Sequence, residues 1–164
     1  MHEYEFSFEI EGTPQEIWGV FVEHHRKGVQ TKAVQVEILT PGDDAANGMV
    51  RHVNYPAPRY LLSGGRAQSW EWITEAVAPV SWRYDAVFKP PFGVATGWTR
   101  LEDLGNGRTR LHFREQVHVR NPVIDRLIGG NLARSIARDN RTHYEQGIPV
   151  WLRDKRAADS TSPR

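Results

Sequence analysis

The segment SIARDNRTHYEQG, residues 135–147, has the periodicity of a helix but carries two titratable side chains where an apolar face is expected. Leu132 and Ile136 begin an apolar stripe, which continues at helical spacing into Asp139 and His143. A carboxylate one helical turn from a histidine can contact the imidazole, raise its pKa and fix its orientation. The pair would bind a ligand hydroxyl or carbonyl, or transfer a proton. Alternatively, the helix leaves the core at this point and both side chains are solvated.

Glu115 interrupts the apolar face of a predicted strand, where it stands between Phe113 and Val117. Burial of an unpaired carboxylate costs on the order of several kcal/mol, or raises the pKa of the group until it is neutral. Glu115 therefore either faces a cavity with a partner, for which His143 or Arg51 would serve, or lies at a strand bend with access to solvent. Our candidate catalytic residues are His143, Asp139, Glu115 and Tyr84.

Composition excludes several classes of function. The chain has 164 residues, enough for one domain with a core, and its net charge of +1 gives no basic field for a nucleic acid. Cysteine is absent, and the adjacent His24 and His25 point apart on either a helix or a strand, so we expect no metal site. No phosphate loop or dinucleotide fingerprint is present, so we expect no cofactor. The chain also lacks a signal peptide and an apolar stretch of membrane-spanning length, which leads us to expect a cytoplasmic protein. For the oligomeric state we expect a monomer or a homodimer.

Hydrophobic periodicity predicts an α+β domain with about seven strands. Strict alternation of apolar and polar side chains in residues 4–10 indicates the first strand. Short turns such as Asn47–Gly48 separate most of the later strands, which predicts antiparallel neighbours. The later strands are expected over residues 34–39, 49–55, 67–77, 81–88, 94–104 and 109–119.

Two short helices are expected after the first strand and one long helix after the last. The segment 13–16, TPQE, supplies an N-cap, a first-turn proline and a capping-box acid. A second helical piece would cover part of residues 23–32. The long helix is expected to begin at residue 122, with Asn121 as its cap, and to run to about residue 146. The pair Gly129–Gly130 is expected to weaken or kink it, and residues 150–156 lie either outside it or continue it after a second kink. Residues 154–164 form a polar tail that we expect to be disordered.

Four segments carry a resemblance to a known family. They are EIEGTPQEIWGVF, GDDAANGMVRHV, WEWITEAVAPVSWRYDAVF and the helix after RNPVIDRLIGG. The segments and their order resemble the START-like superfamily, also called SRPBCC or helix-grip proteins, and within it the polyketide cyclase/dehydrase branch. The resemblance covers residues 3–153 and implies one domain over residues 1–153, in which a curved antiparallel sheet of about six to seven strands wraps around the C-terminal helix. The insertion YPAPRYLLSGG departs from the pattern and leaves the shape of one cavity entrance open.

The resemblance implies a cavity between sheet and helix. Members of the superfamily bind lipids, sterols, polyketides or plant hormones there, and some cyclise or dehydrate polyketides. Aromatic residues that share single faces of the predicted strands suit the walls of such a cavity, although they equally suit a packed core. One parity stays open, because Ile73 lies opposite Trp70 and Trp72 on its strand. The expected ligand-binding residues are Phe6, Phe8, Trp70, Trp72, Trp82, Tyr84, Phe88, Trp98, Phe113, Glu115, Leu132, Ile136, Asp139 and His143.

Three functions are compatible with these residues. The preferred one is binding of a hydrophobic or amphipathic small molecule, lipid-like or polyketide-like, without chemistry. The second is a polyketide cyclase, aromatase or dehydratase, which needs at least two titratable groups converging on one ligand atom. The third is a structural or interaction module, which predicts a filled core and an exposed apolar patch.

Overall fold

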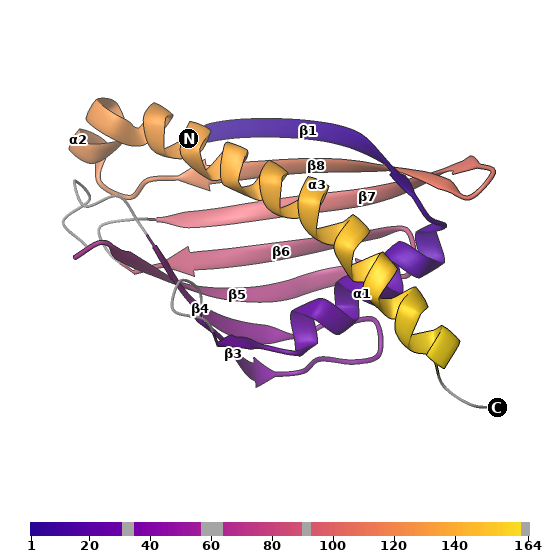
Figure 1. The fold of residues 1–164 in the computed structure, drawn as a ribbon. Helices are drawn as coiled ribbons and strands as arrows, with labels where there is room; N and C mark the ends of the chain where they lie inside the picture. The colour runs from indigo at the N-terminus through magenta and orange to yellow at the C-terminus, as the bar shows by residue number, and fades with distance from the viewer. Residues whose placement is uncertain (31–34, 57–63, 90–92, 162–164) are drawn as a thin grey trace.

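The computed structural model of the chain describes residues 1–30, 35–56, 64–89 and 93–161, which form one antiparallel sheet with helices on a single face (Figure 1). The order across the sheet is β1-β8-β7-β6-β5-β4-β3-β2. We call the helix-covered face the inner face and the opposite face the outer face. The strands are β1 (His2–Glu11), β2 (Val29–Gln30), β3 (Gln35–Thr40), β4 (Val50–Pro56), β5 (Arg66–Val77), β6 (Ser81–Phe88), β7 (Val94–Gly105) and β8 (Arg108–His118). The helical segments are α1 (Pro14–Arg26), α2 (Pro122–Ile124), the π-helical turn η2 (Asp125–Gly129) and α3 (Gly130–Thr161).

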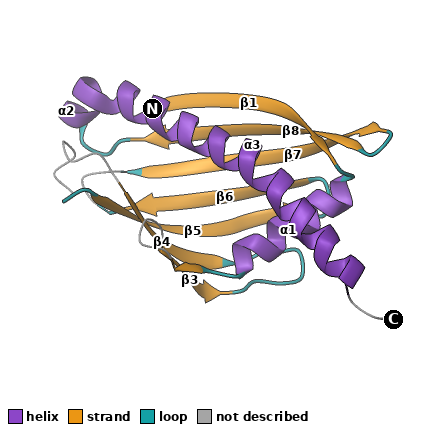
Figure 2. Ribbon diagram, in the orientation of Figure 1, coloured by secondary structure: helices purple, strands orange, loops and turns teal. Residues whose placement is uncertain are grey.

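The predicted α+β helix-grip class is confirmed. All seven predicted strands are present, and the two-residue β2 adds an eighth at one edge. From β2 to β8, each strand pairs with the next one in the sequence, while β1 pairs with β8. Figure 2 shows α3 lying diagonally across the sheet, with α1 beside its C-terminal half. Most of the insertion YPAPRYLLSGG, residues 57–63, lies outside the described residues.

A single continuous helix, α1, follows β1. The predicted capping box is present: the Glu16 backbone N–H donates to the Thr13 hydroxyl (3.3 Å), and the Thr13 N–H donates to the Glu16 carboxylate (2.8 Å). The buried His25 extends the inner side of the helix past the point where the apolar pattern stops. The helix therefore runs to Arg26, and the second short helix expected within residues 23–32 is not found in the described part of that range.

The C-terminal helix is longer than predicted. Asn121 caps its beginning by accepting hydrogen bonds from the N–H groups of the next turn, as expected. The π-helical turn ends at Gly129, at the glycine pair where a kink was predicted. The helix then continues through Pro149 to Thr161, so the expectation of a disordered tail from residue 154 is wrong as far as residue 161.

Two ion pairs join the extra turns of α3 to α1. Lys155 Nζ lies 3.0 Å from the Glu23 carboxylate, and Arg156 Nη2 lies 3.0 Å from the Glu16 carboxylate. Both acids belong to α1, so the last turns of α3 dock on another element instead of extending freely into solvent. A composition-based prediction of disorder cannot include such contacts, because they join residues more than 130 positions apart in the sequence. In the described part of the chain, no helix has an apolar stretch long enough to cross a lipid bilayer.

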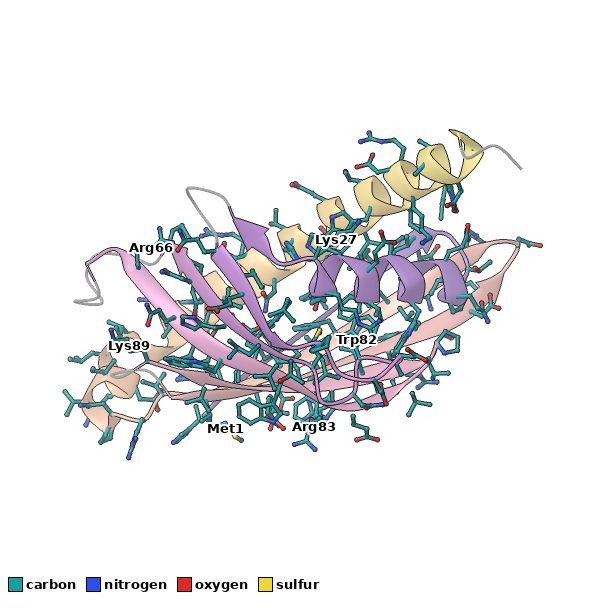
Figure 3. All side chains as sticks on the ribbon, turned by 90° about the horizontal axis from the view of Figure 1, so that it is seen from below. Met1, Lys27, Arg66, Trp82, Arg83 and Lys89 are labelled. Atoms are coloured by element: carbon teal, nitrogen blue, oxygen red, sulfur yellow. The ribbon has the colours of Figure 1, made fainter. Side chains whose placement is uncertain are left out.

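The hydrophobic core occupies one end of the inner face. There α1 and the C-terminal half of α3 pack on the sheet, and Ile17, Leu111 and Ile148 are fully buried. Trp82 stacks on the ring of Phe21, with 3.7 Å between the ring centroids. Figure 3 shows Trp82 and the next residue, Arg83, on opposite faces of the sheet. The other end of the inner face, under the N-terminal half of α3, is packed differently.

Candidate functional site

A pocket of about 560 Å³ lies between the inner face of the sheet and the N-terminal half of α3. The end of α1 closes one side of it. Small side chains create the space, because Ala86 of β6 and Ala95 of β7 stand opposite each other where the core end has Trp82 and Thr99. The lining residues are His24, His25, Val36, Arg51, Val53, Tyr55, Pro56, Ala67, Glu71, Tyr84, Ala86, Phe88, Gly93, Glu115, Val117, Val119, Leu132, Ser135, Ile136, Asp139, Asn140 and His143.

A row of residues across four strands brings together the polar groups at the floor of this pocket. Tyr4 of β1 stands opposite Glu115 of β8, Glu115 opposite Gly97 of β7, and Gly97 opposite Tyr84 of β6. The hydroxyls of both tyrosines donate hydrogen bonds to the Glu115 carboxyl group, Tyr4 to Oε2 and Tyr84 to Oε1. Asn140 of α3 reaches the same group from above, because its Nδ2 donates to the Tyr4 hydroxyl (2.8 Å) and to Glu115 Oε2 (3.5 Å).

Gly97 makes this row possible. Tyr84 and Glu115 are two strands apart, so the tyrosine must cross β7 to reach the carboxyl group. A Cβ atom at position 97 would overlap the Tyr84 ring at Cε1 and Cζ. Glycine inside a strand often marks a close approach of this kind. The Tyr84–Glu115 hydrogen bond therefore depends on a residue without a side chain between them.

The Glu115 carboxyl group is electrostatically unusual. The residue is only 2% exposed, and loss of hydration raises its pKa to about 7, although the hydrogen bonds from Tyr4 and Tyr84 act in the opposite direction. The negative charge of Glu71 also contributes to this raised value. Burial and the neighbouring Glu115 also raise the pKa of both tyrosines, so their hydroxyls remain protonated donors at neutral pH. Glu115 can therefore hold or release a proton near neutrality.

A second polar group in the pocket is an ion pair between β4 and β5. Arg51 Nη2 lies 2.6 Å from Glu71 Oε2, and the other oxygen of Glu71 accepts a hydrogen bond from the Ser69 hydroxyl (2.8 Å). Burial acts to lower the pKa of Arg51, but Glu71 outweighs it and the pKa is raised. Arg51 is therefore charged and already neutralised by a partner within the protein.

Histidines form the third group, on the side of the pocket near α1. His24 stacks on Trp151 of α3, with ring centroids 3.7 Å apart, and the His143 ring lies 5.9 Å from that of His24. Burial, then the neighbouring His143 and Arg51, lower the pKa of His24 to about 4. His25 is buried with its Nδ1 2.8 Å from the Phe21 carbonyl oxygen, and burial holds its pKa well below the ordinary value. Burial and Arg51 also lower the pKa of His143, so these rings are neutral at pH 7.

The structure places half of the predicted ligand-binding residues on the pocket wall. The residues that line it are Tyr84, Phe88, Glu115, Leu132, Ile136, Asp139 and His143. Four others face inward but pack into the hydrophobic core instead: Phe6, Phe8, Trp82 and Phe113.

Three predicted tryptophans lie on the outer face, so the prediction that they line the cavity is wrong. The parity left open for β5 is decided by Ile73, which is buried on the inner face and leaves Trp70 and Trp72 outside. Trp70 stacks on His52, with 4.8 Å between the ring centroids. Trp98 accepts cation–π contacts from two arginines on neighbouring strands, and the hollow around it is lined by charged side chains away from Glu115.

Two partnerships that the sequence left open are not formed in the structure. Asp139 and His143 both line the pocket, but the Asp139 carboxylate is 71% exposed and pairs with Arg138 (3.6 Å) instead of with the histidine. The reason is the direction of the helix, whose inward line passes through Asn140 and the buried Tyr144 and leaves Asp139 and His143 at its flank. For Glu115, the partners are the two tyrosines and Asn140 in place of His143 or Arg51.

Sequence reasoning did not assign several residues of this site, including Tyr4, Arg51 as the partner of Glu71, Gly97 and Asn140. A glycine inside a strand and an asparagine four residues after Ile136 were signals for the last two. The Arg51–Glu71 pair had no signal in the sequence, because the two residues meet only through the β4–β5 register. Among the described residues, no group of three or more His, Cys, Asp or Glu side chains is arranged to hold a metal ion.

Comparison with known proteins supports the fold. No protein-family model and no curated protein matches the chain. Among solved structures, a conserved protein from Geobacillus kaustophilus aligns with a TM-score of 0.69 and 14% identity over 93% of this chain and 96% of its own. The Zhui aromatase/cyclase from a Streptomyces species gives 0.67 and 15%, covering 93% of both chains. A START superfamily protein from Mycobacterium smegmatis gives 0.63 and 11%, covering 94% of this chain and 99% of its own. At these identities the likeness establishes a shared fold.

Proposed function

We propose that this chain, which has the START-like helix-grip fold, binds a hydrophobic or amphipathic small molecule in the pocket under α3. The observation that carries the proposal is the pocket itself, whose volume of about 560 Å³ falls within the range typical of small-molecule sites. A lipid-like or polyketide-like compound, as the family resemblance implies, has an apolar body that suits its walls.

The distribution of side chains in the pocket supports an amphipathic ligand. Apolar side chains from the sheet face the apolar start of α3, while Tyr84, Glu115 and Asn140 provide hydrogen-bonding groups at one place on the floor. A few fixed polar groups in an otherwise apolar pocket orient a ligand more than they add to its affinity. An interaction module would have a filled core across the whole inner face. The core is filled only at the end where α1 packs on the sheet, and the pocket lies at the other end.

Native mass spectrometry of the protein purified from its own source tests the proposal directly. We expect a co-purifying small molecule, or, after its removal, binding of the neutral probe N-phenyl-1-naphthylamine. Ala86→Phe should abolish probe binding by filling the pocket, and Val87→Phe should not, because Val87 is the next residue of β6 and faces outward. Ala67→Phe would fill the pocket from a different part of its wall, and it replaces Ala86→Phe in the experiment if that variant does not fold. Equal probe binding by all folded variants would contradict the proposal.

A second candidate function is proton transfer to a bound polyketide-like substrate. The observation that favours it is the raised pKa of Glu115, about 7, which suits a general acid or base at neutral pH. With a poly-β-ketone thioester as substrate, Glu115→Gln should lower turnover about 100-fold or more. Glu102→Gln, an exposed carboxylate on the adjacent strand β7, is the matched control and should retain full turnover. Turnover that survives Glu115→Gln would refute this second function.

A further inference from the structure

The ionisable groups around the pocket are not balanced. Among the described residues that line it, Arg51 is the one permanent cation, whereas Glu71, Glu115 and Asp139 are carboxylic acids. Arg51 is engaged by Glu71, and Asp139 is exposed and paired with Arg138. Glu115 thus remains as a buried carboxyl group whose hydrogen-bond partners in the described structure are all uncharged.

The Glu115 carboxyl group also has unused acceptor capacity. A carboxylate has two oxygens with about four lone-pair positions. Oε2 accepts from both Tyr4 and Asn140, while Oε1 accepts from Tyr84 alone among the described donors. The described donors therefore leave one acceptor position on Oε1 unfilled, and Glu115 is a lining residue of the pocket.

We propose that the ligand is an amphipathic amine, whose protonated nitrogen donates to the open position on Glu115 while its apolar body lies against α3. The proposal deepens the binding function above and rests on it. An ammonium group would give the buried carboxylate a counter-charge that its described hydrogen-bond partners do not supply. The fold has already removed this carboxyl group from water, so binding adds only the desolvation of the amine.

The same arrangement disfavours an anionic head group. A fatty-acid carboxylate at this place would bring a second negative charge beside Glu115 and near Glu71, and the one arginine among the described lining residues, Arg51, is already paired with Glu71. A neutral alcohol or ketone would satisfy the hydrogen bond without the ionic attraction. The expected order of affinity is therefore amine, then alcohol, then carboxylate.

Displacement of N-phenyl-1-naphthylamine at pH 7.5 by decylamine, decanol and decanoate, which share one chain length, measures this order. We expect decylamine to bind at least about tenfold more tightly than decanol, the effect of one charge-assisted hydrogen bond, and decanoate most weakly. Glu115→Gln should remove the advantage of decylamine over decanol, because an amide keeps a hydrogen-bonding group but not the charge. Glu102→Gln should leave all three affinities unchanged.

The outcomes separate this inference from the function on which it rests. Tightest binding of decanoate, or equal binding of decylamine and decanol, would overturn the inference and leave small-molecule binding intact. If Asp139→Asn removes the preference for decylamine and Glu115→Gln does not, the assignment to Glu115 is wrong. If the probe and all three compounds fail to bind to the folded protein, the proposed function itself fails.

Discussion

The buried carboxyl group of Glu115 should make the stability of this protein fall as the pH rises. Its pKa is about 7 in the folded protein, against 4.5 for an ordinary glutamate in the unfolded chain. Between these values the folded state holds a proton that the unfolded state has lost, so raising the pH favours unfolding. The stabilisation is complete below pH 4.5 and is lost as the pH passes 7. A shift of this size corresponds to about 3 kcal/mol.

Glu115→Gln isolates this contribution, because glutamine resembles the protonated acid and does not titrate. Urea denaturation of both proteins from pH 4.5 to pH 8.5 gives the difference in the free energy of unfolding at each pH. The variant should gain about 3 kcal/mol relative to the wild type across that range. The difference in unfolding free energy between variant and wild type cancels the contributions of other carboxylates. Glu3 and Glu9 are examples: neighbouring arginines lower their pKa values, so they make stability rise with pH.

Glu102→Gln is the control for this experiment. The Glu102 carboxylate is exposed and its pKa is lowered by His112, so its difference curve should have the opposite slope. A flat difference curve for Glu115→Gln, or one that slopes as for Glu102→Gln, would refute the reasoning. The Glu115 carboxyl group would then be ionised in the folded protein at pH 5.

Three further predictions concern other parts of the site. Gly97→Ala should lower the free energy of unfolding by about 1–3 kcal/mol, because the new Cβ overlaps the Tyr84 ring. The control is Gly19→Ala in α1, which has open space around it and should raise the free energy of unfolding by about 0.5–1 kcal/mol. Urea denaturation measures both values. Glu71→Gln, which leaves the largely buried Arg51 guanidinium without a counter-charge, should cost about 3 kcal/mol, and the double variant with Arg51→Met should be more stable than this single variant. Equal instability of single and double variants would show that the ion pair is not the cause. His24→Gln should move the midpoint of acid unfolding to lower pH, as measured by circular dichroism. The pKa of His24 falls to about 4 on folding, so the wild type loses stability as the pH drops from 6.5 toward 4. An unchanged midpoint would contradict the assignment of this effect to His24.

Much of the fold was predictable because its signals are local. The alternation in residues 4–10, the capping box of Thr13 and Glu16 and the Asn121 cap each depend on side chains within a few positions of one another. These signals fixed the order of the elements and most of their boundaries. The end of α3 was mispredicted because the ion pairs that stabilise it join distant parts of the chain.

The candidate site was predictable only in part, for the same physical reason. The sequence alone marked Glu115 as a carboxylate on an apolar face, and the family resemblance implied that the apolar start of α3 forms the wall of a pocket. It also required that a buried Glu115 have partners, since an unpaired carboxylate is costly to bury. It did not determine the partners or the inward face of β5, because alternation makes the two faces of a strand distinct without saying which one is covered.

Tertiary structure alone decided which groups meet. The register places Tyr4, Glu115, Gly97 and Tyr84 in one row, and the docking of α3 turns Asn140 toward that row while Asp139 stays in solvent. Burial then raises the pKa of Glu115 to about 7. A carboxyl group has this property only where strands and a helix together exclude water from it, so the sequence determined the residue and the assembled fold determined its chemistry.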